Sequence, residues 1–87
     1  MTTNEITKFL AKMLLAKSEG ELVETRRTQW GIFIKDRCGD TVEITFEDRD
    51  NIKGVFNIMG KKIEGKVKIE NNKDAIAYSQ IMNMICA

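Results

Sequence analysis

The feature that most constrains the fold of this chain is a pattern that occurs twice between residues 52 and 69. Ile-x-Gly-x-apolar-x-Ile is read at residues 52–58 and again at residues 63–69. Apolar and polar residues alternate in both copies, which is the period of a β-strand with one buried face. Because Gly60 lies between the two copies, the pattern predicts a β-hairpin.

The register of this hairpin follows from a two-residue loop at Gly60-Lys61, with glycine in the first position. That loop places Phe56 opposite Gly65 and brings all inward residues opposite one another. On the outward face Lys53 lies directly opposite Lys68, and like charges so placed destabilise a sheet by up to about 1 kcal/mol. Two interpretations of these lysines stay open. They protect a sheet edge from aggregation, or they form a site for an anion such as phosphate.

Residues 28–47 alternate in the same way and predict a second hairpin. Gly39 suits the left-handed position of a three-residue loop. This odd loop length places Trp30 opposite Phe46, with both side chains facing the core. The other inward pairs that it predicts are Ile34 with Val42 and Ile32 with Ile44. A turn at residues 48–51, rich in Asp and Asn, joins this hairpin to the next.

Helical patterns flank the strands. Residues 6–14 have an apolar stripe, preceded by Thr2 at capping-box spacing and followed by Gly20, a residue type that commonly ends helices. Residues 77–85 have a second stripe, and either residue of Asn71-Asn72 is a suitable N-cap for this helix. The residues expected to face the core are Ile6, Phe9, Leu10, Met13 and Leu14 in the first helix, and Ala77, Tyr78, Ile81, Met82, Met84 and Ile85 in the second.

The expected fold class is therefore α+β, as a single domain over residues 1–87. It has an N-terminal helix, a four-stranded antiparallel meander and a C-terminal helix. Because the sheet and both helices have one apolar side each, both helices are expected on one face of the sheet. The course of residues 21–29 is left open. Leu22-Val23 has the composition of a strand start, and Arg26-Arg27 is expected near its bend.

The composition argues against an enzyme. The chain has no histidine, which removes Ser-His and Cys-His catalytic pairs and imidazole metal ligands. Cys38 and Cys86 lie far apart in the sequence and form no disulfide framework, which is typical of the reducing cytoplasm. Turn formation accounts for Glu47, Asp48 and Asp50, whose spacing lacks the glycine and the distal glutamate of a calcium loop. We expect no catalytic residue, no metal and no cofactor.

No apolar run approaches the ~20 residues of a membrane span. The N-terminal pattern is amphipathic and contains Glu5, unlike a signal peptide. We therefore expect a cytoplasmic protein with no membrane partner. The abundance of Ile, Lys and Asn is typical of an AT-rich bacterial or phage genome.

The charge distribution favours a nucleic-acid interface. Residues 21–50 carry eight acids and five bases, whereas residues 51–70 carry five lysines and two glutamates. An open sheet face with an aromatic ring and lysines can stack a base and contact phosphates, which favours RNA. The N-terminus of the second helix adds a region where the helix dipole favours anions. The candidate nucleic-acid-binding residues are Phe33, Lys35, Lys53, Lys66, Lys68 and Lys73.

The order helix, strands, helix over residues 3–86 also resembles the double-stranded RNA-binding domain, and the resemblance implies RNA binding. The chain departs from that family at the start of the second helix. Ile69-Glu70-Asn71-Asn72 stands there in place of a glycine-rich approach, and Lys73 is all that remains of a basic run.

The expected function is a small non-enzymatic RNA-binding protein, which in one version inhibits an RNA-associated target. The alternative is a phage-type or bacterial inhibitor or adaptor that blocks a host defence or toxin enzyme by docking, without nucleic acid. The net charge of +1 favours this alternative, because dedicated RNA binders are usually strongly basic. In either case a homodimer is expected, through a free edge strand or the open sheet face.

Overall fold

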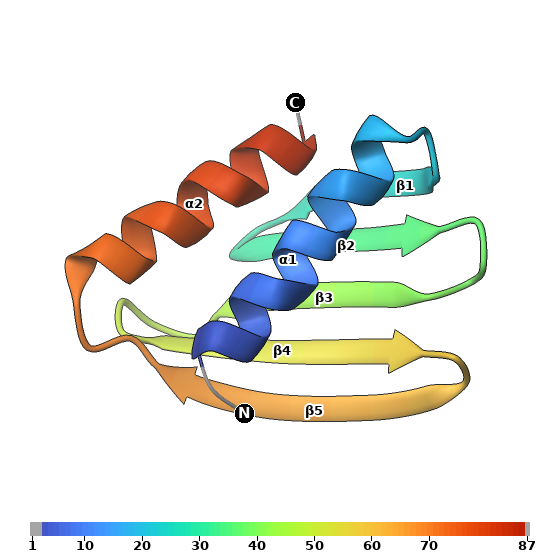
Figure 1. The fold of residues 1–87 in the computed structure, drawn as a ribbon. Helices are drawn as coiled ribbons and strands as arrows, with labels where there is room; N and C mark the ends of the chain where they lie inside the picture. The colour runs from blue at the N-terminus through green and yellow to red at the C-terminus, as the bar shows by residue number, and fades with distance from the viewer. Residues whose placement is uncertain (1–2, 87) are drawn as a thin grey trace.

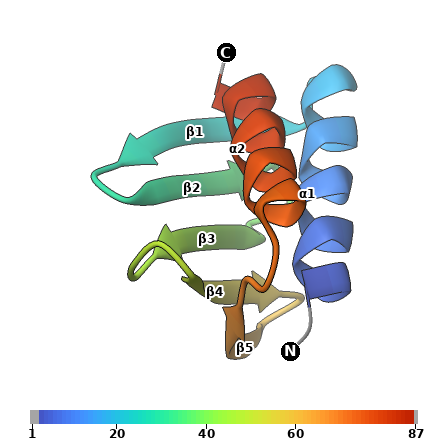
Figure 2. The same ribbon diagram turned by 90° about the vertical axis from the view of Figure 1, so that its left-hand side faces the viewer.

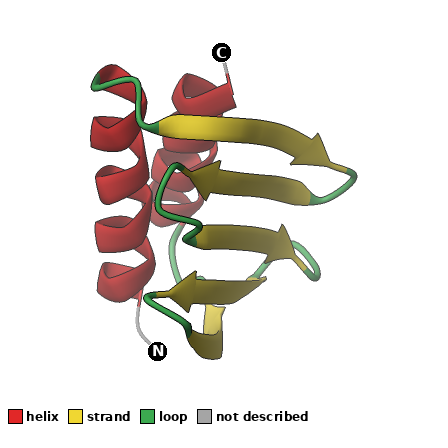
Figure 3. Ribbon diagram, turned by 90° about the vertical axis from the view of Figure 1, so that its right-hand side faces the viewer, coloured by secondary structure: helices red, strands yellow, loops and turns green. Residues whose placement is uncertain are grey.

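The computed structural model describes residues 3–86 as two helices and a five-stranded antiparallel sheet (Figure 1). The elements are α1 (Thr3–Ser18), β1 (Leu22–Thr28), β2 (Gly31–Asp36), β3 (Thr41–Phe46), β4 (Asn51–Ile58), β5 (Lys61–Lys68) and α2 (Asn72–Cys86). The strands lie side by side in sequence order. Figures 2 and 3 view the sheet from two opposite directions, and both draw the two helices on the same side of it. The α+β class is as predicted, but the prediction of four strands is wrong.

The additional strand is β1, formed by the residues whose course the sequence left open. Thr28 pairs with Gly31, so a two-residue turn, Gln29-Trp30, joins β1 to β2. Arg26-Arg27 lies within the strand and not at a bend. The strand escaped prediction because it lies at the sheet edge with most of its residues exposed, so no apolar alternation marks it.

The hairpin between β2 and β3 has the predicted three-residue loop, with Gly39 at a φ of 86°. Its predicted pairs also form, Ile34 with Val42 and Ile32 with Ile44. Trp30 differs from the prediction in part. It lies opposite Phe46 as predicted, because the Phe46 N–H donates to its carbonyl oxygen at 2.8 Å. Its side chain, however, belongs to the β1–β2 turn and is 64% exposed, so it is not in the core.

The hairpin between β4 and β5 turns at Met59-Gly60 and not at Gly60-Lys61. Both residues of this loop have positive φ, 53° and 81°, as a type I′ turn requires. The register is therefore shifted by two residues, and Lys53 lies opposite Lys66 instead of Lys68. A shift of two residues leaves every side chain on its predicted face, because the side-chain period of a strand is two.

One hydrophobic core lies between the helices and the sheet. Its buried residues are Ile6, Leu10 and Met13 from α1, Ile32, Ile34, Val42, Ile44, Ile52, Phe56, Val67 and Ile69 from the sheet region, and Tyr78, Met82 and Ile85 from α2. Phe9, Leu14 and Ile81 pack against it partly buried, as the predicted stripes require. Ala77 and Met84 are exposed, contrary to prediction. Each precedes a buried residue by one position and is therefore rotated about 100° away from the core-facing stripe.

Two helix ends form as predicted. Gly20, at a φ of 72°, and the residue after it donate backbone hydrogen bonds into the last turn of α1. Asn71 is the N-cap of α2, because its side-chain oxygen accepts a hydrogen bond from the backbone N–H of Asp74 at 2.9 Å. The predicted cap Thr2 lies outside the described residues.

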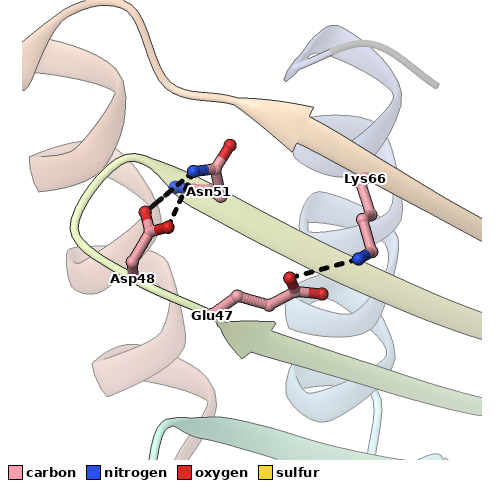
Figure 4. Close-up of polar contacts among 4 residues, drawn as sticks. All are labelled: Glu47, Asp48, Asn51 and Lys66. Carbon is pink, nitrogen blue, oxygen red and sulfur yellow. Dashed lines mark hydrogen bonds and ion pairs between the residues drawn. The ribbon is translucent and has the colours of Figure 1, made fainter.

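The turn between β3 and β4 is organised by the carboxylate of Asp48 (Figure 4). Its Oδ1 accepts hydrogen bonds from the backbone N–H groups of Asp50 at 2.8 Å and Asn51 at 2.9 Å. Both carboxylate oxygens also accept from the side-chain amide of Asn51 at 2.9 Å. These bonds, above all the one from the Asn51 side chain, lower the pKa of Asp48 from its usual 3.8.

We expect Asp48→Asn to destabilise the protein at neutral pH and to flatten the acid side of its stability profile. Because the pKa of Asp48 is lower in the folded than in the unfolded state, its stabilising effect is complete above the unfolded value of 3.8. That effect is lost as the pH falls through the folded-state pKa. Urea unfolding across the acid range measures it, with Asp50→Asn in the same turn as the control. Equal pH profiles for the wild-type protein and Asp48→Asn would contradict the prediction.

Candidate nucleic-acid interface

The sheet face turned away from the helices, called the open face below, concentrates positive charge. The strand register places six basic residues on it, namely Arg26, Lys35, Lys53, Lys62, Lys66 and Lys68. The acidic residues of the same strands on this face are Glu24, Glu43 and Glu64. Glu47, just after β3, is a fourth acid beside Lys66. Six positive minus four negative charges leave +2, on a chain whose total is +1. The near-neutral total therefore conceals one basic surface.

Three lysines meet at one corner of the open face, and this group is called the lysine corner. Lys53 of β4 lies directly opposite Lys66 of β5, and Lys68 lies two residues further along β5. Protection of a sheet edge accounts for Lys66 and Lys68, because β5 is an edge strand. It does not account for Lys53, because β4 has a neighbouring strand on both sides.

Glu47, which follows β3, partly neutralises this corner (Figure 4). Its Oε2 lies 3.3 Å from the Nζ of Lys66, whose side chain is 67% exposed. Exposed ion pairs contribute only about 0–1 kcal/mol, so a phosphate can replace the carboxylate readily. Within residues 3–86, Lys53 and Lys68 take part in none of the recorded ion pairs.

Phe33, the predicted stacking ring, lies on the open face beneath an arginine. Arg26 of β1 is its partner in the register, and the guanidinium carbon lies 5.1 Å from the ring centroid. This is a cation–π contact, and Arg26 also lies 3.5 Å from Glu24. A nucleobase approaching here would stack on the guanidinium plane. Arg26 is not among the predicted site residues, because the sequence indicates a bend near this position.

The other two candidates lie away from the lysine corner. Lys35 also lies on the open face, but across the sheet it is in register with Thr41 and Asn57. Asn57 is four residues, or about 13 Å, from Lys53 along β4. Lys73 lies in the first turn of α2, in the helix layer. Asn71 bonds the backbone N–H of Asp74 there, and the Asp74 carboxylate occupies the same turn. The N-terminus of α2, where an anion site was predicted, is therefore already occupied by the negative charge of Asp74.

The described part of the chain has no group of three His, Cys, Asp or Glu side chains that could hold a metal ion. The Cys38 thiol is exposed and the Cys86 thiol is half-buried, and both are free. Neither described helix is long and apolar enough to cross a membrane.

Comparison of the chain with protein-family models, curated proteins and solved structures finds no match. The five-stranded sheet also departs from the element order on which the resemblance to the double-stranded RNA-binding domain rested. The charge and geometry of the open face are therefore the basis for assigning a function.

Proposed function

We propose that this chain is a small non-enzymatic nucleic-acid-binding protein that binds RNA through its open face. The lysine corner supports this most directly. Lys53 and Lys66 face each other as like charges, and a phosphate bound between them would relieve their repulsion. The charge of +2 on this face adds the long-range attraction that draws nucleic acid to a basic surface.

Single-stranded RNA fits the open face better than a duplex. Sequence-specific RNA recognition mostly uses unpaired bases, which stack on aromatic rings or guanidinium planes. The Arg26–Phe33 pair offers such a plane on the same face as the lysine corner. Lys35 and Lys62, at the far end of the face, lie where they would contact a longer strand.

Reversing the charge of Lys53, Lys66 and Lys68 to Glu is expected to weaken binding of single-stranded RNA by roughly two orders of magnitude. It should also lower the slope of log affinity against log salt by about 2, because each lost phosphate contact removes about 0.7. Fluorescence anisotropy with a labelled oligonucleotide at several salt concentrations measures both quantities.

Two further variants make this test specific to the lysine corner. Lys8, Lys12 and Lys61 changed to Glu give the same change in net charge away from the open face, and should retain most of the affinity. Glu47→Gln removes the carboxylate that competes for Lys66, and should strengthen binding by about 1.5- to 5-fold. Absence of any complex at low salt would contradict the proposal. A protein partner that survives nuclease treatment during purification, with no RNA bound, would favour the docking inhibitor instead.

A further inference from the structure

Trp30 is an exposed aromatic residue in the two-residue turn between β1 and β2. It is 64% exposed, although neither the turn nor the core requires an indole at this position. Its backbone is fixed, because its carbonyl oxygen accepts a hydrogen bond from the N–H of Phe46 at 2.8 Å. Exposed aromatic rings on fixed backbone commonly mark contact sites, because their large flat surface is ordered before a ligand arrives.

A hollow of about 400 Å³ lies beside the indole, between the β1–β2 turn and α2. This volume is within the range of small-ligand sites, about 300–1,000 Å³. The side chains that bear on the argument are Arg27 and Gln29 from the β1–β2 region, Trp30 itself, and Ser79 and Asn83 from α2. The Arg27 guanidinium donates a hydrogen bond to the Asn83 side-chain oxygen and so ties the strand to the helix across the hollow.

The chemistry of this hollow matches the edge and face of a nucleobase. Gln29 and Asn83 carry amide groups and Ser79 a hydroxyl, and such groups pair with the donors and acceptors on a base edge. Arg27 has five N–H donors, so its bond to Asn83 leaves donors for a base or phosphate oxygen. All the residues that line this hollow are free of carboxylates. A second hollow that Trp30 also lines contains Glu47, Asp48 and Arg49, and its net charge of −1 is less favourable for a phosphate.

We propose that the hollow beside Trp30 binds one unpaired nucleobase, stacked on the indole, of the RNA strand that crosses the open face. This inference rests on the proposed function and adds a base-specific contact to it. The hollow lies on the helix side of the sheet, because Arg27 and Phe46 are in register with the core residues Ile32 and Ile52 and α2 forms its other wall. Gly31, next to Trp30, begins a row on the open face that continues through Thr45 to Lys53 and Lys66. With strands about 4.8 Å apart, Gly31 and Lys66 are about 14 Å apart, and a strand of several nucleotides covers this distance and the passage around the β1–β2 turn into the hollow.

The test uses the intrinsic fluorescence of Trp30, the only tryptophan of the chain. The full chain is titrated with single-stranded oligouridylate and oligoadenylate of about eight nucleotides, a typical site size for a small single-strand-binding domain. An abasic oligomer of equal length is the backbone control, and binding is followed separately by anisotropy. The base-containing strands should quench the fluorescence at saturation, whereas the abasic strand should bind without quenching.

Trp30→Ala is expected to weaken binding of the base-containing strands by about 5- to 100-fold and to leave the abasic strand unaffected. Trp30→Phe should fall between Trp30→Ala and the wild-type protein, because it keeps a ring. Leu15→Ala, at an apolar residue of α1 that is 59% exposed, is the control and should change neither affinity. Circular dichroism verifies that each variant is folded.

The outcomes separate this inference from the proposed function. Salt-dependent binding with unchanged fluorescence, and full affinity in Trp30→Ala, would overturn the base site and leave the lysine corner in place. Failure of every oligonucleotide to bind would overturn both proposals.

Discussion

Replacing Phe56 by alanine is expected to lower the free energy of unfolding by about 3–5 kcal/mol. Phe56 is fully buried and stacks on Phe9, with ring centroids 4.1 Å apart and planes inclined by 23°. Its ring also covers Gly54, since a Cβ on that glycine would lie only 2.6 Å from the ring. Truncation leaves a cavity that cannot collapse, because β4 is hydrogen-bonded on both sides and Gly54 has no side chain to fill the space.

The expected loss is a large part of the total stability, which is about 4–13 kcal/mol for a chain of this length. Urea unfolding followed by circular dichroism measures it. Val55→Ala, on the open face of the same strand, is the control and should cost less than about 1.5 kcal/mol. The Phe9→Ala and Phe56→Ala double mutant should show a coupling of about 0.5–1.5 kcal/mol from the stacked rings. A loss below 1 kcal/mol for Phe56→Ala would contradict this account of the core.

Phe56 also shows how far the sequence predicts this hairpin. The sequence predicts that the Phe56 ring covers Gly65, its expected partner on the neighbouring strand. In the structure Phe56 pairs with Ile63, and its ring covers Gly54 of its own strand. The difference arises because Met59-Gly60 forms the turn with two left-handed residues, and methionine at such a position gives no local signal. The faces were nevertheless predicted, since they depend only on odd and even spacing along a strand.

One feature, the edge strand β1 with its turn, explains why two residues of the candidate site were not predicted. Lys53, Lys66 and Lys68 share a face by spacing alone, so the sequence predicts that they lie together. Arg26 and Trp30 depend on β1 and its turn, which the sequence left undefined because that strand has no apolar alternation. One signal for the turn was available in Gln29-Trp30-Gly31, where a glycine opens the strand that follows a two-residue loop.

Gly31→Ala is expected to destabilise the protein by about 3 kcal/mol or more. A Cβ at this position would lie 1.7 Å from the carbonyl oxygen of Ile44 and 2.8 Å from its carbonyl carbon. Both are backbone atoms, so no side-chain rotation relieves the clash, and β2 must move away from β3. That movement breaks the pairing of Gly31 with Thr45 and strains the bond from Phe46 N–H to the Trp30 carbonyl.

Gly39→Ala is the control, because it replaces a glycine at which a Cβ would meet no backbone atom. It separates the clash with the Ile44 carbonyl from the general effect of losing a glycine. Gly39 has open space around its Cα, and alanine there meets only the strain of a φ of 86°, about 1–2 kcal/mol. Urea unfolding of both variants measures the difference, and equal losses would contradict the prediction. Because Gly31 holds the Trp30 turn against β3 and begins the row that ends at Lys66, its substitution should also change the tryptophan emission of the folded protein. The residue that makes the sheet close-packed at this end is therefore also the one that positions the proposed base-binding ring.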